Sequence, residues 1–397
     1  MLTPARLMDL TEGLVDFWAQ LEQDITKSIV RRLLQNGFIT DTSAWQIRKL
    51  RDMRMLEEDI AKEIVRMSKL SEKEVARLVN AACKEALAYD DAIYDEMGLT
   101  PTPIAQAEVL QELIKASIDR TNGLMQNFTN TTAETASKAF ENALDRAFLQ
   151  VQSGAFSYQH ALSEVIKTLG SQGIKKIAYP TDHTDHMDVA ARRALLTGLN
   201  QATAQLQIAR MDEVGCDLVE VTSHAGARPS HAAWQGKVYS RSGKRKEYEH
   251  FNVTGYGSGD GLCGWNCYHN FFPFYEGLSS QTFEQNPSKR LGKSNDQVYE
   301  ESQKQRAYER AVREKKRLCV TLEEAIKATD DTEMQTALNE EFQRAAVALK
   351  RREAKLKEYC KETNRTRLKD RESTYGFGRS VSQKAVQANK KAQQEAE

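Results

Sequence analysis

Two cysteines and three histidines in the middle of the chain are the residues whose types and spacing could support chemistry. Cys263 and Cys267 are followed closely by His269 in GLCGWNCYHNFFPF, and His224 and His231 lie upstream in SHAGARPSH. Thiolate and imidazole are the ligands that zinc prefers, and a CxxxC spacing occurs in zinc sites. These five residues are therefore candidate ligands of a structural zinc ion, which would cross-link a glycine-rich segment that has few strands.

A second interpretation of the same residues needs no metal. Free cysteine often behaves as a small buried hydrophobic residue, so Cys263 and Cys267 would lie in a tight turn while His231 and His269 bond to the backbone. Neighbouring aromatic residues would then form a small core, consisting of Trp234, Trp265, Phe271 and Phe272. Both interpretations stay open, because the spacing lacks the paired CxxC motifs of a strong zinc signature.

The glycine-rich string TGYGSGDGLCG, at 254–264, resembles a phosphate-binding loop in composition only. No Walker lysine follows it, and aromatic residues with Pro273 stand where a helix would be needed. We therefore expect a turn-rich loop in which glycine permits positive φ. The missing helix also argues against a small ββα-metal nuclease, and no cysteine is placed at a helix start as cysteine-protease chemistry requires.

Amphipathic helical patterns dominate the N-terminal half of the chain. With only 7 prolines in 397 residues, long helices can run without a break. Leucine and isoleucine recur at helical spacing over 7–36, where Gly37 would end the helix, and capping-box patterns at Ser43 and Ser71 predict two shorter helices. A long helix is predicted over 104–148, interrupted by the polar and β-branched residues of 121–132.

The C-terminal half alternates between a compact module and charged helices. Helices are predicted at 158–169 and 185–214, a strand at 217–223, and a helical hairpin from 299 to about 359, on a heptad pattern. The polar end of the chain is predicted to be disordered.

The chain is thus predicted to be mainly α with a small α+β central module. Its predicted regions are an N-terminal helical region at 1–100, a long-helix region at 101–180, a compact core with the Cys/His cluster at 181–280, and a charged helical arm with a disordered tail at 281–397.

Composition and charge narrow the class of protein. No apolar run approaches the roughly 20 residues of a membrane span, and the N-terminus lacks a secretory signal. Six cysteines in this length are not a disulfide framework, so we expect synthesis in a reducing cytoplasm. The net charge is zero, but residues 301–397 hold 23 basic against 17 acidic residues.

This basic excess gathers on one predicted helix, where it suggests contact with DNA phosphates. A solvated helical face is the alternative interpretation. The candidate contacts are Arg306, Arg310, Arg313, Lys315, Lys316 and Arg317.

Two segments carry a family resemblance. VEVTSHAGARPSHAAWQGKVYS, at 219–240, and TGYGSGDGLCGWNCYHNFFPFYEGLS, at 254–279, together resemble the phage minor capsid protein 2 family, a distant relative of the head-morphogenesis proteins of the phage Mu F type. SQKQRAYERAVREKKR, at 302–317, is similar to the helical segment that usually follows in the family. The resemblance covers most of 180–320.

The resemblance implies a structural minor capsid protein of a tailed phage or prophage. Such a protein would be made in the host cytoplasm, reside in the phage head at the portal vertex, and act in head assembly and in DNA packaging or ejection. Its partners would be the portal protein, the major capsid protein and packaged double-stranded DNA. The family implies no catalytic residues, and the cluster of His224, His231, Cys263, Cys267 and His269 would stabilise the fold through a metal ion or through packing.

The alternative from another class is a metal-dependent nucleic-acid enzyme or a prophage-borne toxin. The arm at 281–397 lacks the glycine-rich β pattern expected of such a toxin.

Overall fold

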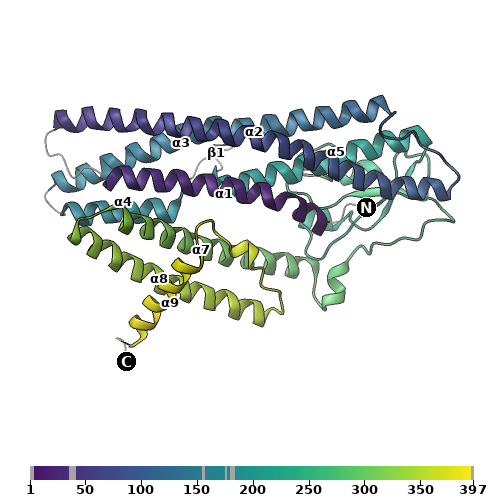
Figure 1. Ribbon diagram of the computed structural model, residues 1–397. Helices are drawn as coiled ribbons and strands as arrows, with labels where there is room; N and C mark the ends of the chain where they lie inside the picture. Colours follow the sequence, from purple (N-terminus) through teal and green to yellow (C-terminus); the bar gives the residue numbers. More distant parts are fainter. Residues whose placement is uncertain (1–3, 35–41, 154–156, 175–176, 179–183, 395–397) are drawn as a thin grey trace. The chain divides into compact units, whose positions relative to one another are not determined.

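A computed structural model describes residues 4–34, 42–153, 157–174, 177–178 and 184–394 of the chain (Figure 1). The chain forms two compact units, each drawn from three separated stretches of sequence. Unit 1 combines Met1–Val15, Ser68–Asn127 and Ala191–Gln303, and unit 2 combines Asp16–Met67, Phe128–Ala190 and Lys304–Glu397.

Unit 1 has a buried central helix, α5 (Met187–Val214). Apolar residues recur on several faces of this helix, and Leu195, Leu199 and Leu206 are fully buried, which is typical of a helix surrounded by other elements. The helix ends where predicted, because Gly215 adopts a left-handed φ of 68° that favours glycine. Parts of α2 (Thr42–Glu96) and α3 (Glu108–Gln152) complete the helical layer of this unit.

A small mixed sheet lies beside these helices in unit 1. Its strand order is β5-β4-β3-β6, in which β3 pairs antiparallel with β4 and β6, and β4 pairs parallel with β5. The strands are β3 (Leu218–Val221), β4 (Val238–Ser240), β5 (Glu249–His250) and β6 (Phe271–Pro273). Val219, Tyr239 and Phe271 pack from the sheet into one apolar core with Met211 of α5 and Tyr94 of α2.

Short elements connect this core to the loops around it. They are α6 (Pro229–Ala232) and the 3-10 helices η1 (Phe251–Thr254) and η2 (Pro287–Leu291).

Unit 2 is a helical assembly that includes the predicted hairpin. It contains α4 (Tyr158–Gln172), α8 (Thr332–Glu362) and α9 (Arg379–Gln394), most of α1 (Pro4–Leu34) and α7 (Asn295–Ala328), and the parts of α2 and α3 that lie outside unit 1. It also holds the 3-10 helix η3 (Asp370–Glu372) and a two-stranded antiparallel sheet of β1 (Ile177–Ala178) and β2 (Thr184–Asp185).

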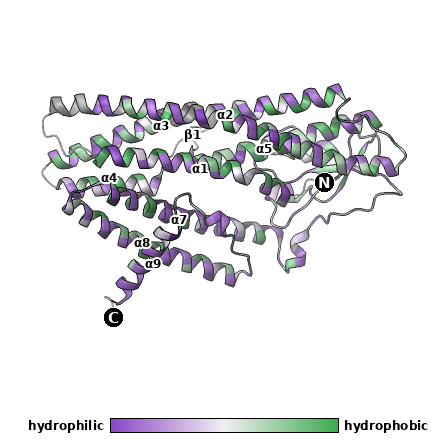
Figure 2. Ribbon diagram, in the orientation of Figure 1, coloured by the Kyte–Doolittle hydropathy of each residue, from purple (hydrophilic) through white to green (hydrophobic). Residues whose placement is uncertain are grey.

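The α7–α8 hairpin is confirmed. Asp331 starts α8 by accepting hydrogen bonds from the backbone N–H groups of Glu333 and Met334. Leu338, Phe342 and Leu349 are buried on the heptad face, and Figure 2 shows hydrophobic and hydrophilic positions alternating along these helices.

Two local predictions in the N-terminal half were wrong. Residues 42–96 form one helix, so no helix begins at Ser71. The hydroxyl of Ser71 is buried inside this helix and has no hydrogen-bond partner among the described residues. The break predicted at 121–132 is absent from α3. Thr121 lies within the helix, and its hydroxyl donates to the backbone carbonyl of Ser117. The predicted stop at Gly37 lies outside the described residues.

The tail predicted to be disordered is largely helix α9. Val381 and Ala385 lie one turn apart and are buried, and α9 packs against α8, so a narrow apolar face holds an otherwise polar helix. The predicted fold class, mainly α with a small α+β module, is confirmed. The division into four consecutive regions stays a prediction. No helix in the described part of the chain is long and apolar enough to cross a membrane.

Candidate metal centre

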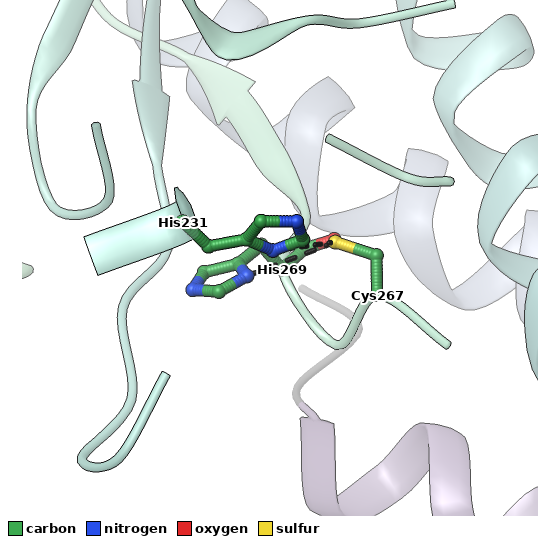
Figure 3. Close-up of side chains that lie close together, drawn as sticks. All are labelled: His231, Cys267 and His269. Carbon is green, nitrogen blue, oxygen red and sulfur yellow. Dashed lines mark hydrogen bonds between the residues drawn. The ribbon is translucent and has the colours of Figure 1, made fainter. Parts of the chain in front are cut away.

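Three of the five predicted ligands come together in unit 1. His231 lies in α6, and Cys267 and His269 lie in the segment that leads into β6 (Figure 3). The Sγ atom of Cys267 is 3.9 Å from Nδ1 of His231 and 3.7 Å from Nδ1 of His269. All three side chains are buried, and their ligand atoms lie within 4.8 Å of one another.

The other two predicted ligands lie beside this group without joining it. The thiol of Cys263 points to the backbone oxygen of His269, with its sulfur 3.7 Å from that oxygen. The ring of His224 stacks on the ring of His269 at a centroid separation of 4.5 Å, and its Nδ1 is 3.2 Å from the backbone oxygen of Ala225. The structure therefore narrows the candidate ligands to His231, Cys267 and His269, which we call the His/Cys group.

The glycine-rich loop positions the two cysteines through close backbone approaches. A Cβ on Gly261 would stand 2.0 Å from the backbone oxygen of Gly255, so this coil of the loop can close only with glycine at that position. Gly255 and Gly257 have positive φ, as predicted. Cys263 also has a positive φ, of 59°, which is rare for a residue with a side chain and requires firm support from the surrounding structure.

Hydrogen bonds fix the outer side of both histidine rings. Nε2 of His231 donates to the backbone oxygen of Asp260 across 2.8 Å, and Nε2 of His269 lies 2.9 Å from Oε1 of Gln235. Gln235 was not predicted as part of the site, although it stands in the WQGK motif. Its amide also contacts backbone groups of His224 and Gln285.

Burial controls the protonation of the group. It lowers the pKa of His231 and lowers the pKa of His269 well below its usual range, so both imidazoles are neutral near neutral pH. It raises the pKa of Cys267 and raises the pKa of Cys263 still further, so without a metal ion both thiols keep their protons. Neutral imidazoles have the lone pairs that metal binding needs, and a bound metal would displace the thiol proton.

The packing interpretation also accounts for part of the surroundings. Trp234, Phe271 and Phe272 are buried, as that interpretation expects. Trp265 differs, since 63% of it is exposed, so it does not contribute to a core. Trp234 packs against both histidine rings of the His/Cys group, with ring-centroid separations of 4.6 Å from His231 and 4.9 Å from His269.

The six predicted DNA contacts lie on α7, in the part that belongs to unit 2. Arg310 is exposed and the other five are half-buried. Arg313 donates to the backbone oxygen of Arg371, and Lys316 donates to that of Glu372. Arg317 lies 3.3 Å from Nε2 of His186. Several of these cations therefore have intramolecular partners, and contact with DNA stays a prediction.

Comparison with known proteins places the chain in a family. The sequence profile of the family described as phage minor capsid protein 2 matches residues 2–361. The chain belongs to this family. A structural protein of Lactococcus phage LL-H is 22% identical over 345 residues, which cover 83% of this chain and 89% of the relative. No solved structure gives a significant match.

This membership confirms the family resemblance in the central segments and extends it over nearly the whole chain. The chain is a structural phage protein and a component of the virion. The helices of unit 2 that follow the His/Cys group belong to the matched region as far as residue 361.

Proposed function

We propose that this minor capsid protein associates with the portal vertex of the phage head and acts in head assembly and in DNA packaging or ejection. The observation that carries the proposal is the family match over residues 2–361, supported by the phage structural protein that aligns with most of the chain. Its partners are the portal protein, the major capsid protein and, in the filled head, double-stranded DNA.

The state of the His/Cys group supports a structural role without enzymatic activity. His231, Cys267 and His269 are each at most 2% exposed. Their ring nitrogens and thiol face one another, backbone oxygens and the side-chain amide of Gln235. Catalytic groups need access to a substrate, and side chains as deeply buried as these three do not have it.

Portal association predicts co-purification from infected or induced cells. A chain with a C-terminal affinity tag is expected to bring down the portal protein from lysates, and the portal protein should be absent from pull-downs with an equally tagged cytoplasmic protein. Repeating the experiment with a major-capsid deletion tests whether the contact precedes shell assembly. Failure to recover the portal protein under both conditions contradicts the proposed location.

The rival function, a metal-dependent nucleic-acid enzyme, has a separate test. The purified chain is incubated with double-stranded and single-stranded DNA and with Mg²⁺, Mn²⁺ or Zn²⁺. We expect the DNA to stay intact, because assembly requires no bond cleavage. Cleavage that disappears in His231→Gln would favour the enzyme instead.

A further inference from the structure

We propose that His231, Cys267 and His269 bind one zinc ion through Nδ1 of each histidine and Sγ of the cysteine. The site would fasten α6 to the loop that leads into β6, and so would hold the glycine-rich loop against the sheet. This inference goes beyond the proposed function and does not rest on it, because it concerns only the chemistry of unit 1.

The tautomer of His231 follows from its outer partner. Nε2 of this ring lies 2.8 Å from the backbone oxygen of Asp260. A carbonyl oxygen can only accept, so Nε2 must carry the hydrogen. In the neutral ring Nδ1 is then an unprotonated acceptor, and it faces the sulfur of Cys267.

The tautomer of His269 follows from the orientation of one amide. Oε1 of Gln235 accepts from the backbone N–H of His224, and Nε2 of Gln235 donates to the backbone oxygen of Gln285. Turning this amide over would place donor against donor and acceptor against acceptor, so its orientation is fixed. Oε1 therefore also accepts from Nε2 of His269, which leaves Nδ1 of that ring as a second lone pair facing Cys267.

The interior of the group consequently has more acceptors than hydrogens. A thiol has one hydrogen to donate, whereas the sulfur of Cys267 faces Nδ1 of His231, Nδ1 of His269 and the backbone oxygen of His269. The backbone oxygen of His269 also accepts from the side-chain amide of Asn200 and faces the thiol of Cys263. The deficit therefore falls on the two Nδ1 atoms, because the single hydrogen of the Cys267 thiol can serve only one of them at any moment. A buried acceptor without a donor is unfavourable, and a cation between the lone pairs and the sulfur removes the deficit for both rings.

The two nitrogen–sulfur distances suit a tetrahedral zinc ion. Zinc–nitrogen and zinc–sulfur bond lengths imply an N···S separation of about 3.6 Å between tetrahedral ligands. The two N···S separations here are 3.7 and 3.9 Å. Two imidazoles with a thiolate favour zinc over magnesium or calcium, which prefer oxygen ligands. The outer contacts to Asp260 and Gln235 are the kind that orients histidine ligands of metals.

Three protein ligands leave the fourth tetrahedral position to water or another small ligand. Cys263 is not assigned to this position, because it does not belong to the group of ligand atoms that all lie within 4.8 Å of one another.

The test uses two buried cysteines of the same loop as a matched pair. The full chain is produced in zinc-supplemented medium, and zinc is measured per chain after gel filtration. We expect about one zinc per chain in the wild type and in Cys263→Ser. In Cys267→Ser the affinity for zinc should fall by at least roughly 10- to 100-fold, which is the loss expected when a hydrogen-bond partner of a metal ligand is removed. Zinc-free wild type, or zinc loss in Cys263→Ser with retention in Cys267→Ser, would overturn the proposal.

A second matched pair of variants, and a measurement on the wild type, distinguish loss of a zinc ligand from misfolding of a variant. His231→Gln should lose zinc, whereas His224→Gln, at a ring stacked beside the group, should keep it. X-ray absorption of the zinc-loaded wild type should show one sulfur at about 2.3 Å and nitrogen or oxygen neighbours at about 2.0 Å. Two sulfur neighbours would show that Cys263 is a ligand and would contradict the three-residue assignment.

Discussion

Replacement of Arg210 by alanine is expected to lower the free energy of unfolding by about 3 kcal/mol. The substitution would leave the polar partners of this side chain without their cation and would create a cavity. The Arg210 side chain is fully buried in α5. Its Nε lies 3.1 Å from Oδ1 of Asp91, and its Nη1 lies 2.8 Å from Oε2 of Glu213. Nη1 also donates to the backbone oxygen of Thr102. One side chain therefore joins α5 to α2 and to the segment between α2 and α3.

Urea unfolding followed by circular dichroism measures this loss. Arg77→Ala is the matched control, because Arg77 pairs with Glu74 on the surface of α2 and most of its side chain is exposed. A surface pair of this kind contributes less than about 1 kcal/mol. Equal losses of unfolding free energy in the two variants would show that the buried Arg210 stabilises unit 1 no more than a surface arginine does.

Asp90→Asn is expected to stabilise the protein increasingly as the pH rises. Asp90 is fully buried in α2, where burial raises the pKa of its carboxyl group to about 8. The side-chain amide of Gln207 donates to Oδ2 across 2.9 Å, and Oδ1 has no hydrogen-bond partner among the described residues. The folded chain thus keeps a proton that the unfolded chain loses near pH 4.

The sign of the effect follows from this difference in bound protons. Between about pH 4 and pH 8 the folded state binds more protons at Asp90, so stability falls as the pH rises through this window. Asparagine removes the titration, and the gain over wild type should grow from near zero at pH 4 to at most roughly 4 kcal/mol at pH 7.

Urea midpoints of both proteins across this pH range provide the measurement. Asp119→Asn, at an exposed position of α3, is the control and should leave the pH profile close to that of the wild type. A constant difference between Asp90→Asn and wild type from pH 4 to pH 8 would contradict a protonated Asp90 in the folded state.

Helical periodicity predicted most of the fold because amphipathic stripes are a local property of the sequence. The hairpin of α7 and α8 and the end of α5 at Gly215 followed from such patterns. Local signals failed at Ser71, because a capping pattern cannot distinguish a helix start from a helix interior that tertiary packing buries. They failed also at α9, whose short apolar face is completed only by contact with α8.

For the candidate site, the sequence indicated the residue types but not the geometry. His231, Cys267 and His269 meet as expected for a metal centre, whereas His224 and Cys263 have the same chemistry and point elsewhere. Spacing alone could not separate the two cysteines, because the directions of their side chains depend on the coil of the glycine-rich loop. Gln235 was missed because its role appears only when the backbone of His224 and the ring of His269 converge on its amide.

Quantitative mass spectrometry of purified particles, full and emptied of DNA, tests whether the chain is a minor component of the phage head. We expect the chain to be present in full particles at a few copies, far below the major capsid protein and comparable with the portal protein. Loss on emptying would add a role in ejection, and retention would place the protein among the permanent parts of the head. Absence from purified full particles would contradict a minor capsid protein at the portal vertex.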